Sequence, residues 1–284
     1  MLKKLYPHKI LWLASYPKSG NTWFRAFLSA LMNDGEVAIN KLETDGIISA
    51  RETFDVVSDI DSMDLYDEEA KLMVNNIYTH IAQSSDSLRI IKTHDAYLTE
   101  KNGTSIFPSE VTHCAFYFIR NPLDVAGSLA SHMRLSIEEC VNIMCDNNAT
   151  LATQKNNLNK NKQFRVNMGD WSTNVTSWTN GVPFPVHVIR YEDMLSNPFE
   201  TFSKAVSQAK FNYSPEEISR AIKATSFDQL KKQETQFGFV EKLTRDVQFF
   251  RSGTMGNWEK ELSPVQITKI MQTHGDVMSQ YGYI

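Results

Sequence analysis

The sequence predicts an α/β fold in which helices cover both faces of a central, mainly parallel β-sheet, giving three layers. Short apolar runs alternate along the chain with segments of helical periodicity. These runs are continuous rather than alternating in polarity, which is typical of parallel strands that are covered on both faces. Both observations favour a sheet of parallel strands joined by helices.

Four segments have the composition of buried strands. They span residues 10–15, 88–93, 113–119 and 186–189. The first is followed by a short polar loop and then by apolar side chains at helical spacing from Trp23 to Met32, which predicts an amphipathic helix.

Two further helices are predicted from their first residues. Asn121 before Pro122 joins a capping side chain to a proline in the first turn, and Ser263 before Pro264 repeats this pattern near the C-terminus. Residues 34–87 and 145–170 are expected to be helical or irregular insertions.

Composition limits the class of protein. The 284 residues are 42% hydrophobic and 22% charged, without a linker-like tract, so we expect one globular domain over residues 1–284. The net charge of −4 gives no support to a nucleic-acid or anionic-membrane partner.

The N-terminal apolar run is too short for a signal peptide, and no stretch is long enough to cross a bilayer. The three cysteines lack zinc-ligand spacing and fit a reducing compartment, so a cytoplasmic protein with buried thiols is expected.

The loop SYPKSGNTW (15–23) joins the first predicted strand to the first helix. The N–H groups at a helix start are unpaired and carry partial positive charge, so such a loop binds anions, especially phosphates. An ATP-binding P-loop reads G-x-x-x-x-G-K-[ST]. Here the upstream glycine is missing, and Lys18 precedes Gly20 instead of following it. The loop predicts a P-loop-like nucleotide cradle without the register of a standard NTPase.

This loop resembles the 5′-phosphosulfate-binding loop of the sulfotransferases that use 3′-phosphoadenosine 5′-phosphosulfate (PAPS), whose usual form is TYPKSGTTW. Other motifs of that family follow in order over almost the whole chain. They are IIKTH (90–94), YFIRNPLDVAGS (117–128), VIRYEDM (188–194), ATSF (224–227) and FFRSGTMGNW (249–258). The resemblance implies sulfuryl transfer from PAPS to a hydroxyl, or less often an amine, of a small-molecule acceptor, with 3′,5′-ADP as product and no metal.

The resemblance also implies roles for single residues. His94 is implied as the general base, and Lys18 as the cation that stabilises the leaving phosphate. Lys92 is a weaker candidate. It could bind the phosphosulfate, or it could simply extend its amine to solvent at the end of a strand. The 5′-phosphate would be bound by the loop that also contains Ser19, Gly20, Asn21 and Thr22.

The 3′-phosphate distinguishes PAPS from ATP. Arg120 ends a predicted strand where a helix begins, so its guanidinium can make two parallel bonds to a phosphate. Ser128 and Arg251 are implied as further contacts, with the Gly253 backbone near the nucleotide. A buried pair between Arg120 and Asp124 is the alternative.

Near the C-terminus the chain departs from the family pattern at two positions. The usual R-K-G reads Arg251-Ser252-Gly253, so a hydroxyl replaces one expected cation, and Asn257 replaces a common aspartate. The first change puts the role of Ser252 in question and could weaken 3′-phosphate binding.

The resemblance implies an adenine site of stacking and edge contacts. Trp23 and Phe227 would stack on the base, with Tyr191 and Thr225 at its polar edge, although Trp23 also fits the core stripe. Glu192 and Asp193 look like paired carboxylates. On an extended strand, however, neighbours point to opposite faces, which argues against a shared catalytic role.

The acceptor is expected to contact the variable segments 34–87, 130–170 and 232–248, the last with the composition of a closing lid. Trp171, Val175 and Trp178 are expected in the core. No match to the short C-terminal dimerisation motif of the animal cytosolic enzymes is found, so a monomer or weak homodimer is expected. Two alternatives stay open: a P-loop kinase or NTPase, and a non-catalytic nucleotide-binding protein on the same fold.

Overall fold

The computed structural model of the chain describes residues 8–44, 49–99, 103–152, 162–242 and 247–284. Within these residues the central sheet has four parallel strands in the order β2-β1-β3-β6. The strands are β1 (Ile10–Ser15), β2 (Arg89–Thr93), β3 (Thr112–Ile119) and β6 (Val186–Arg190). Each lies where the sequence predicts it, within one residue at either end, which confirms the α/β class with a parallel sheet.

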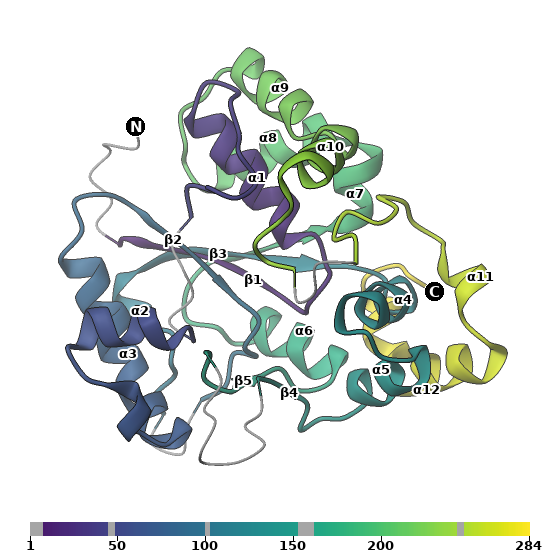
Figure 1. Ribbon diagram of the computed structural model, residues 1–284, viewed down its shortest axis with the longest axis horizontal. Coiled ribbons are helices and arrows are strands. Elements are labelled where there is room, and N and C mark those ends of the chain that lie inside the picture. The colour runs from purple at the N-terminus through teal and green to yellow at the C-terminus, as the bar shows by residue number, and fades with distance from the viewer. Residues whose placement is uncertain (1–7, 45–48, 100–102, 153–161, 243–246) are drawn as a thin grey trace.

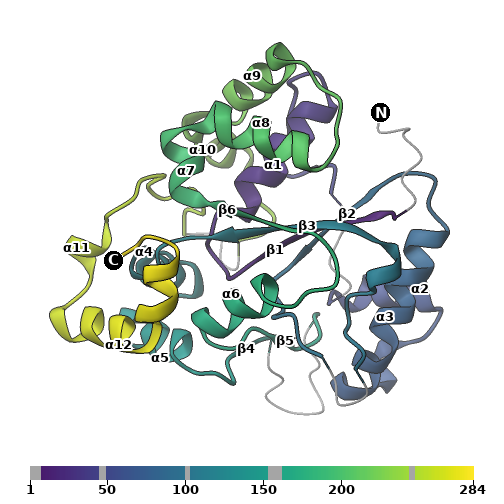
Figure 2. The same cartoon turned by 180° about the vertical axis from the view of Figure 1, so that it is seen from behind.

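Helices form a layer on each face of the sheet (Figures 1 and 2). One face is covered by α1 (Asn21–Met32), α7 (Tyr191–Ser196), α8 (Pro198–Gln208), α9 (Pro215–Ala224) and α10 (Phe227–Phe237). The other is covered by α4 (Pro122–Met133), α5 (Ile137–Met144), α6 (Trp171–Thr179) and α12 (Pro264–Gln280). On this second side, at the β2 edge, lie α2 (Arg51–Ser58) and α3 (Asp67–Gln83), with the 3-10 turns η1 (Ser62–Asp64) and η2 (Ser109–Val111) nearby.

Two hydrophobic clusters fill the space between the sheet and its helices. Along β1, Ile10, Trp12 and Ala14 enter the cluster shared with α3–α6 and α12. Leu11 and Leu13 point the other way, into the cluster shared with α1, α8 and α9. Because both sides of the strand are completely buried, its sequence reads as one apolar run instead of an alternating one.

The predicted helix starts are formed by the expected caps. The Asn121 side chain accepts a hydrogen bond from Leu123 N at 3.0 Å, with Pro122 as the first residue of α4. Ser263 begins α12 with a reciprocal capping box to Gln266. The apolar stripe from Trp23 to Met32 lies within α1, as predicted.

The insertions differ in part from the prediction. Residues 34–87 contain α2 and α3, but 145–170 contain β4 (Thr150–Leu151) and β5 (Val166–Asn167), an antiparallel pair that the sequence did not predict. Strands of two residues are too short to give a periodic signal, so the polar Asn- and Lys-rich composition dominated the prediction.

The four parallel strands end at the same edge of the sheet, at Ser15, Thr93, Ile119 and Arg190. In open α/β sheets, ligands bind outside these carboxyl ends. Every predicted motif residue that follows a strand is thereby brought to one edge. In the described part of the chain, no helix combines the length and the apolar character needed to cross a membrane.

Candidate active site

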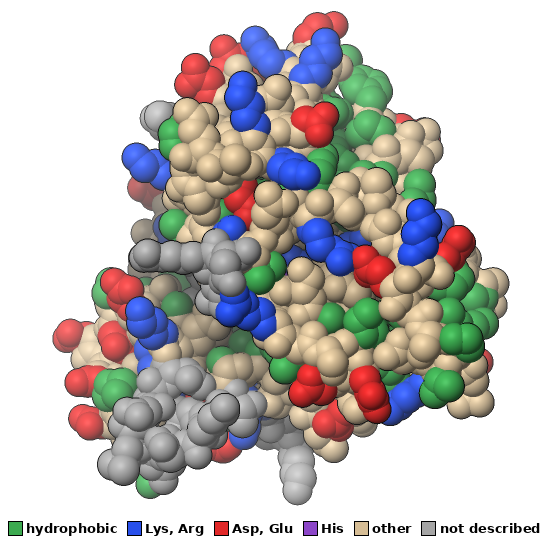
Figure 3. Space-filling model, turned by 45° about the vertical axis from the view of Figure 1, so that its right-hand side comes forward, with side chains coloured by type: hydrophobic (Ala, Val, Ile, Leu, Met, Phe, Trp, Pro, Cys, Tyr) green, Lys and Arg blue, Asp and Glu red, His purple; other side chains and the backbone are tan. Residues whose placement is uncertain are grey.

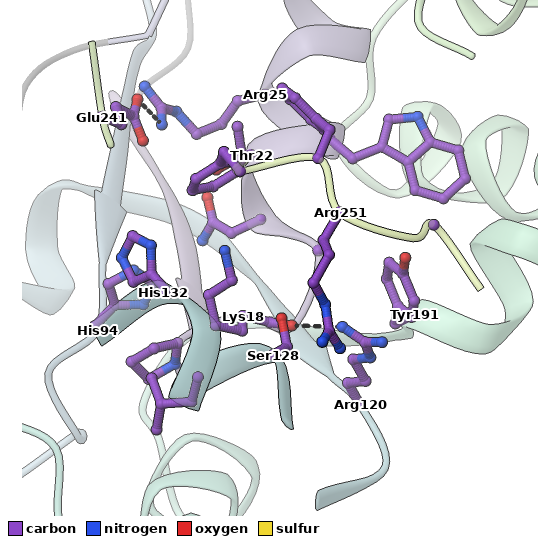
Figure 4. A pocket seen from close by; sticks show the side chains of 18 of the residues that line it. Lys18, Thr22, Arg25, His94, Arg120, Ser128, His132, Tyr191, Glu241 and Arg251 are labelled. Carbon is purple, nitrogen blue, oxygen red and sulfur yellow. Dashed lines mark hydrogen bonds and ion pairs between the residues drawn. The ribbon is translucent and has the colours of Figure 1, made fainter. Parts of the chain in front are cut away.

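A cavity of about 580 Å³ lies at this edge of the sheet, between α1, α4 and the segment that follows α10. Among its described lining residues, five are cations and one is a carboxylate; these are Lys18, Arg25, Lys92, Arg120, Arg251 and Glu241. Lys and Arg side chains are visible in a recess of the space-filling view (Figure 3), and Figure 4 shows those of the cavity from close by. A chain with a net charge of −4 thus concentrates positive charge in one cavity, as an anion site requires.

The loop between β1 and α1 has two residues in the left-handed region, Lys18 (φ 67) and Gly20 (φ 99). A Cβ on Gly20 would lie 2.6 Å from Met194 Cε and 2.8 Å from Tyr191 Cδ2, so the missing side chain lets α7 pack on the loop. The Asn21 amide donates to Leu13 O at 2.8 Å and to Ser15 Oγ at 3.3 Å. Asn21 therefore ties the loop to β1 with its amide nitrogen.

Several buried polar atoms around this loop have no hydrogen-bond partner among the described residues. They include Ser19 Oγ, Trp23 Nε1 and Arg120 Nε. Buried donors are normally paired, and leaving each one unpaired costs about 1–3 kcal/mol. The three donors surround the start of α1, where N–H groups and the helix dipole also favour negative charge. The arrangement fits an anionic ligand whose oxygens would accept these bonds, and the Thr22 hydroxyl lies at the same cavity.

Lys18 lies inside the cavity, with Nζ 3.7 Å from the centroid of the Phe249 ring. Burial, together with the charges of Arg120 and Lys92, lowers the pKa of Lys18 from 10.5 to about 7. A bound anion would reverse part of this effect, because it favours the protonated amine.

His94 follows β2 and contacts the end of β1. Its Nδ1 lies 2.8 Å from Ser15 O and 3.2 Å from Ser15 Oγ. Because a carbonyl oxygen only accepts, Nδ1 carries the proton and Nε2 holds the free lone pair. Burial first, and then the charge of Lys92, lowers the pKa of His94 to about 3, so the ring is neutral at physiological pH. A neutral imidazole with a free Nε2 is the form that a general base requires.

Arg120 ends β3, and its guanidinium lies 4.3 Å from the centroid of the Tyr191 ring. Its Nη1 donates to Lys18 O at 3.2 Å and its Nη2 to Thr254 O at 3.3 Å. The alternative pairing with Asp124 is wrong, because Asp124 instead accepts the backbone N–H groups of Gly256 and Trp258 at 2.8 and 3.1 Å. Arg120 keeps its buried Nε free for a ligand.

Ser128 and Arg251 lie at the same end of the cavity as Arg120 (Figure 4). Arg251 Nη2 pairs with Glu261 Oε1 at 2.8 Å. Asn257 donates from Nδ2 to Ser252 Oγ at 2.8 Å, so the two departures from the family pattern contact each other. A neutral hydrogen bond thus joins the two positions at which the family pattern has a lysine and an aspartate.

The predicted stacking residues line the cavity, but a predicted edge contact does not. Trp23 packs edge-on against Phe202 of the core at 5.6 Å and still lines the cavity, so both of its predicted roles are compatible. Phe227 is covered by Gly253, where a Cβ would lie 2.3 Å from the ring. Thr225 is completely buried outside the cavity lining, and its hydroxyl donates to Ala221 O at 2.8 Å. The hydroxyl donates within the last turn of α9, so toward the adenine it could act only as an acceptor, and the role of Thr225 stays a prediction.

The strand assignment for Glu192 and Asp193 is also wrong, because both residues lie in the first turn of α7. Glu192 accepts hydrogen bonds from Asn121 N at 2.9 Å and from the Tyr283 hydroxyl at 3.0 Å. Asp193 lies 3.9 Å from Arg190. Glu192 also lies 4.0 Å from Arg190, so the two carboxylates share this arginine, but neither of them lines the cavity.

Sequence reasoning missed a charged group at the other end of the cavity. Glu241 pairs with Arg25 at 2.6 Å and with Lys92 at 3.3 Å. Burial alone would raise the pKa of Glu241, but the two cations lower it to about 2. Glu241 belongs to the predicted lid segment 232–248, of which residues 243–246 lie outside the described residues. The sequence signal for this ion pair is Arg25 itself, a charged residue between Phe24 and Phe27 in the apolar stripe of α1.

His132 was also missed. It lies one turn after Ser128 on α4, and its ring meets Phe249 edge-on at 5.7 Å. Burial and then the charge of Lys18 lower its pKa to about 4, so it presents a second neutral imidazole to the cavity. The i, i+4 spacing from Ser128 was the available signal.

The remaining predictions concern residues away from the cavity. Trp171, Val175 and Trp178 are completely buried in one cluster, as predicted. Cys114 and Cys140 are buried, whereas Cys145 is only half-buried. Within the described residues, no cluster of three or more histidine, cysteine or acidic side chains is arranged to hold a metal ion.

Residues 8–282 match the family model described as the sulfotransferase domain. The chain belongs to this family. Among curated sulfotransferases, it is similar to Sulfotransferase 1B1 of Mus musculus, with 22% identity over 94% of this chain and 82% of that protein. It is also similar to Cytosolic sulfotransferase 1 of Arabidopsis thaliana, with 26% identity over 91% of this chain and 75% of that protein.

Solved sulfotransferase-fold structures superpose on the chain as well. Mouse sulfotransferase SULT7A1 complexed with PAP gives a TM-score of 0.60 at 18% identity, covering 95% of this chain and 85% of that one. Retinol dehydratase in complex with androsterone and inactive cofactor PAP gives 0.63 at 16% identity, covering 97% and 82%. At these identities the likeness confirms the fold of this sulfotransferase-family chain.

Proposed function

We propose that this chain transfers the sulfuryl group of PAPS to a hydroxyl group, or less often an amine, of a small-molecule acceptor. The observation that carries the proposal is the set of unpaired buried donors and cations at the start of α1 and the end of β3. Two groups of donors, one around Lys18 and one around Arg120, suit a ligand with two separate phosphate groups. The product PAP named in the structures of two fold relatives is such a ligand.

In this proposal, the β1–α1 loop binds the 5′-phosphosulfate through Lys18, Ser19 and the N–H groups at the start of α1. Arg120, with Ser128 and Arg251, binds the 3′-phosphate. The adenine lies between Trp23 and Phe227, with Tyr191 beside it; all three residues line the cavity. Tyr191 lies on the side of the cavity away from His94 (Figure 4).

The chemical step is an in-line displacement at sulfur. The acceptor oxygen forms a bond to sulfur as the bond from sulfur to the bridging phosphate oxygen breaks, and the acceptor proton passes to His94 Nε2. Protonated Lys18 stabilises the charge that develops on the departing oxygen. The negative charge of the donor raises the pKa of Lys18, which favours the protonated amine, and also raises the pKa of His94, which makes its neutral imidazole a stronger base.

The acceptor is proposed to enter beside His94, His132 and Phe249, all of which line the cavity. Androsterone and retinol are named in solved structures of relatives, which supports a hydroxylated small molecule here. We further propose a single catalytic domain over residues 1–284, in a cytoplasmic protein that acts as a monomer or weak homodimer. The plant relatives named as cytosolic support the compartment.

A nucleotide panel tests the donor. We expect 3′,5′-ADP to raise the melting temperature of the purified protein more than 5′-AMP or ATP with Mg²⁺ does. Preferential stabilisation by ATP–Mg²⁺ would instead favour a P-loop kinase. If 3′,5′-ADP binds but labelled PAPS donates to no acceptor in a broad panel of hydroxylated compounds and amines, the chain is a nucleotide-binding protein without this activity.

A further inference from the structure

Beside the cavity end that holds Arg120, Ser128 and Arg251 lies a carboxylate that the proposed reaction does not use. Glu261 is the last residue of α11 (Trp258–Glu261), and its two oxygens lie 2.8 and 3.0 Å from Arg251 Nη2. Both side chains are partly exposed, 39% for Arg251 and 27% for Glu261, and Arg251 also lines the cavity.

Two features fix Glu261 at this place. Asp124 of α4 accepts hydrogen bonds from Gly256 N and Trp258 N, which docks α11 on α4. Gly127 then leaves room for the carboxylate, since a Cβ there would lie 1.9 Å from Glu261 Oε2. The carboxylate therefore lies against α4 one residue before Ser128.

The charges at this end of the cavity are few. Arg120 and Arg251 supply two positive charges, Glu261 removes one, and the neutral Ser252–Asn257 hydrogen bond adds none. A 3′-phosphate carries close to two negative charges at neutral pH. It would meet an arginine that is already paired and a carboxylate of like charge beside it.

We propose that Glu261 is a specificity-determining residue that lowers the affinity of this site for the nucleotide 3′-phosphate, by holding Arg251 and by repelling the phosphate. The inference rests on the proposed function, because it takes Arg251 as a contact of the 3′-phosphate. Its consequence is weak retention of the product 3′,5′-ADP, which favours product release.

The test compares dissociation constants of 3′,5′-ADP and 5′-AMP, which differ by the 3′-phosphate. Exposed ion pairs of this kind change equilibria by roughly two- to fivefold. We expect Glu261→Gln to tighten 3′,5′-ADP by about that factor and to leave 5′-AMP unchanged. Glu259→Gln, an exposed carboxylate on the same helix, is the matched control for net charge and should change neither constant.

An Arg251→Gln background separates this effect from a general structural one. There Glu261→Gln should tighten 3′,5′-ADP less, because no arginine is left to release. If Glu261→Gln does not fold, Gly127→Ala, which displaces the carboxylate without removing it, should tighten 3′,5′-ADP in the same direction.

Weaker or unchanged 3′,5′-ADP binding in Glu261→Gln, or an equal change in Glu259→Gln, would overturn the inference while leaving the donor site intact. Failure of the proposed function looks different: the wild-type protein would then show no preference for 3′,5′-ADP over 5′-AMP.

Discussion

The pKa of Lys18 leads to a pH dependence of nucleotide binding that can be worked out from the structure. In the free protein this pKa is about 7, lowered by burial and then by Arg120 and Lys92. A 5′-phosphate beside Lys18 favours its charged form, so binding above pH 7 must take up a proton. The affinity for 3′,5′-ADP is therefore expected to fall as the pH rises.

The size of the effect follows from proton linkage. Between pH 7.5 and 9.0 the protonated fraction of Lys18 in the free protein falls from about one quarter to about one hundredth, so the affinity falls roughly 20-fold. His94 and His132, with pKa values of about 3 and about 4, stay neutral over this range. The phosphates, with a second pKa near 6, stay ionised.

Isothermal titration calorimetry in two buffers of different ionisation enthalpy measures both the affinity and the proton uptake. At pH 8 we expect uptake of about 0.9 proton. Lys18→Met is the control, and its weaker binding should vary little with pH. An affinity that stays constant from pH 7.5 to 9.0 in the wild-type protein, or falls equally in Lys18→Met, would refute the assignment of Lys18 to the 5′-phosphate.

Three further predictions test other parts of the site. Arg120→Ala should reduce the preference for 3′,5′-ADP over 5′-AMP by about 10- to 100-fold, because charged hydrogen bonds contribute about 1.5–3 kcal/mol each. The preference is measured by competition binding. An unchanged preference would show that Arg120 does not contact the 3′-phosphate. Glu241→Gln leaves Arg25 and Lys92 without their partner and should lower the free energy of unfolding in urea by about 2 kcal/mol. The exposed control Glu68→Gln should lower it by less than about 0.5 kcal/mol. Equal losses in the two variants would contradict a structural role for Glu241. In the same assay, Gly20→Ala should lower the free energy of unfolding by about 2 kcal/mol more than Gly181→Ala does. Both glycines have a positive φ, but only a Cβ at Gly20 would meet neighbouring atoms. Similar losses of stability in the two variants would contradict the tight packing of α7 on the loop.

Much of the fold was predictable because its signals are local. The central strands β1 and β3 are buried on both faces and therefore read as apolar runs. The Asn-Pro and Ser-Pro pairs begin α4 and α12 as their capping chemistry predicts. The β4–β5 pair gave no periodic signal, since each strand has two residues.

The site was predictable where a family motif covers the residue. Lys18, His94 and Arg120 lie within such motifs and all line the cavity. Glu241 reaches Arg25 across 216 positions of sequence, and no local pattern predicts such a pairing. Thr225 is predicted from a motif match as a ligand contact, and the structure shows its hydroxyl donating to the backbone of α9.

The central claim, sulfuryl transfer with His94 as base and Lys18 at the leaving oxygen, is tested most directly by single-turnover transfer from labelled PAPS to an acceptor found in the panel screen. We expect transfer by the wild-type protein. His94→Asn should slow it by about 10²–10⁴-fold while 3′,5′-ADP binding is kept, and Lys18→Met should slow it as well. Transfer at the wild-type rate in both variants would contradict the account.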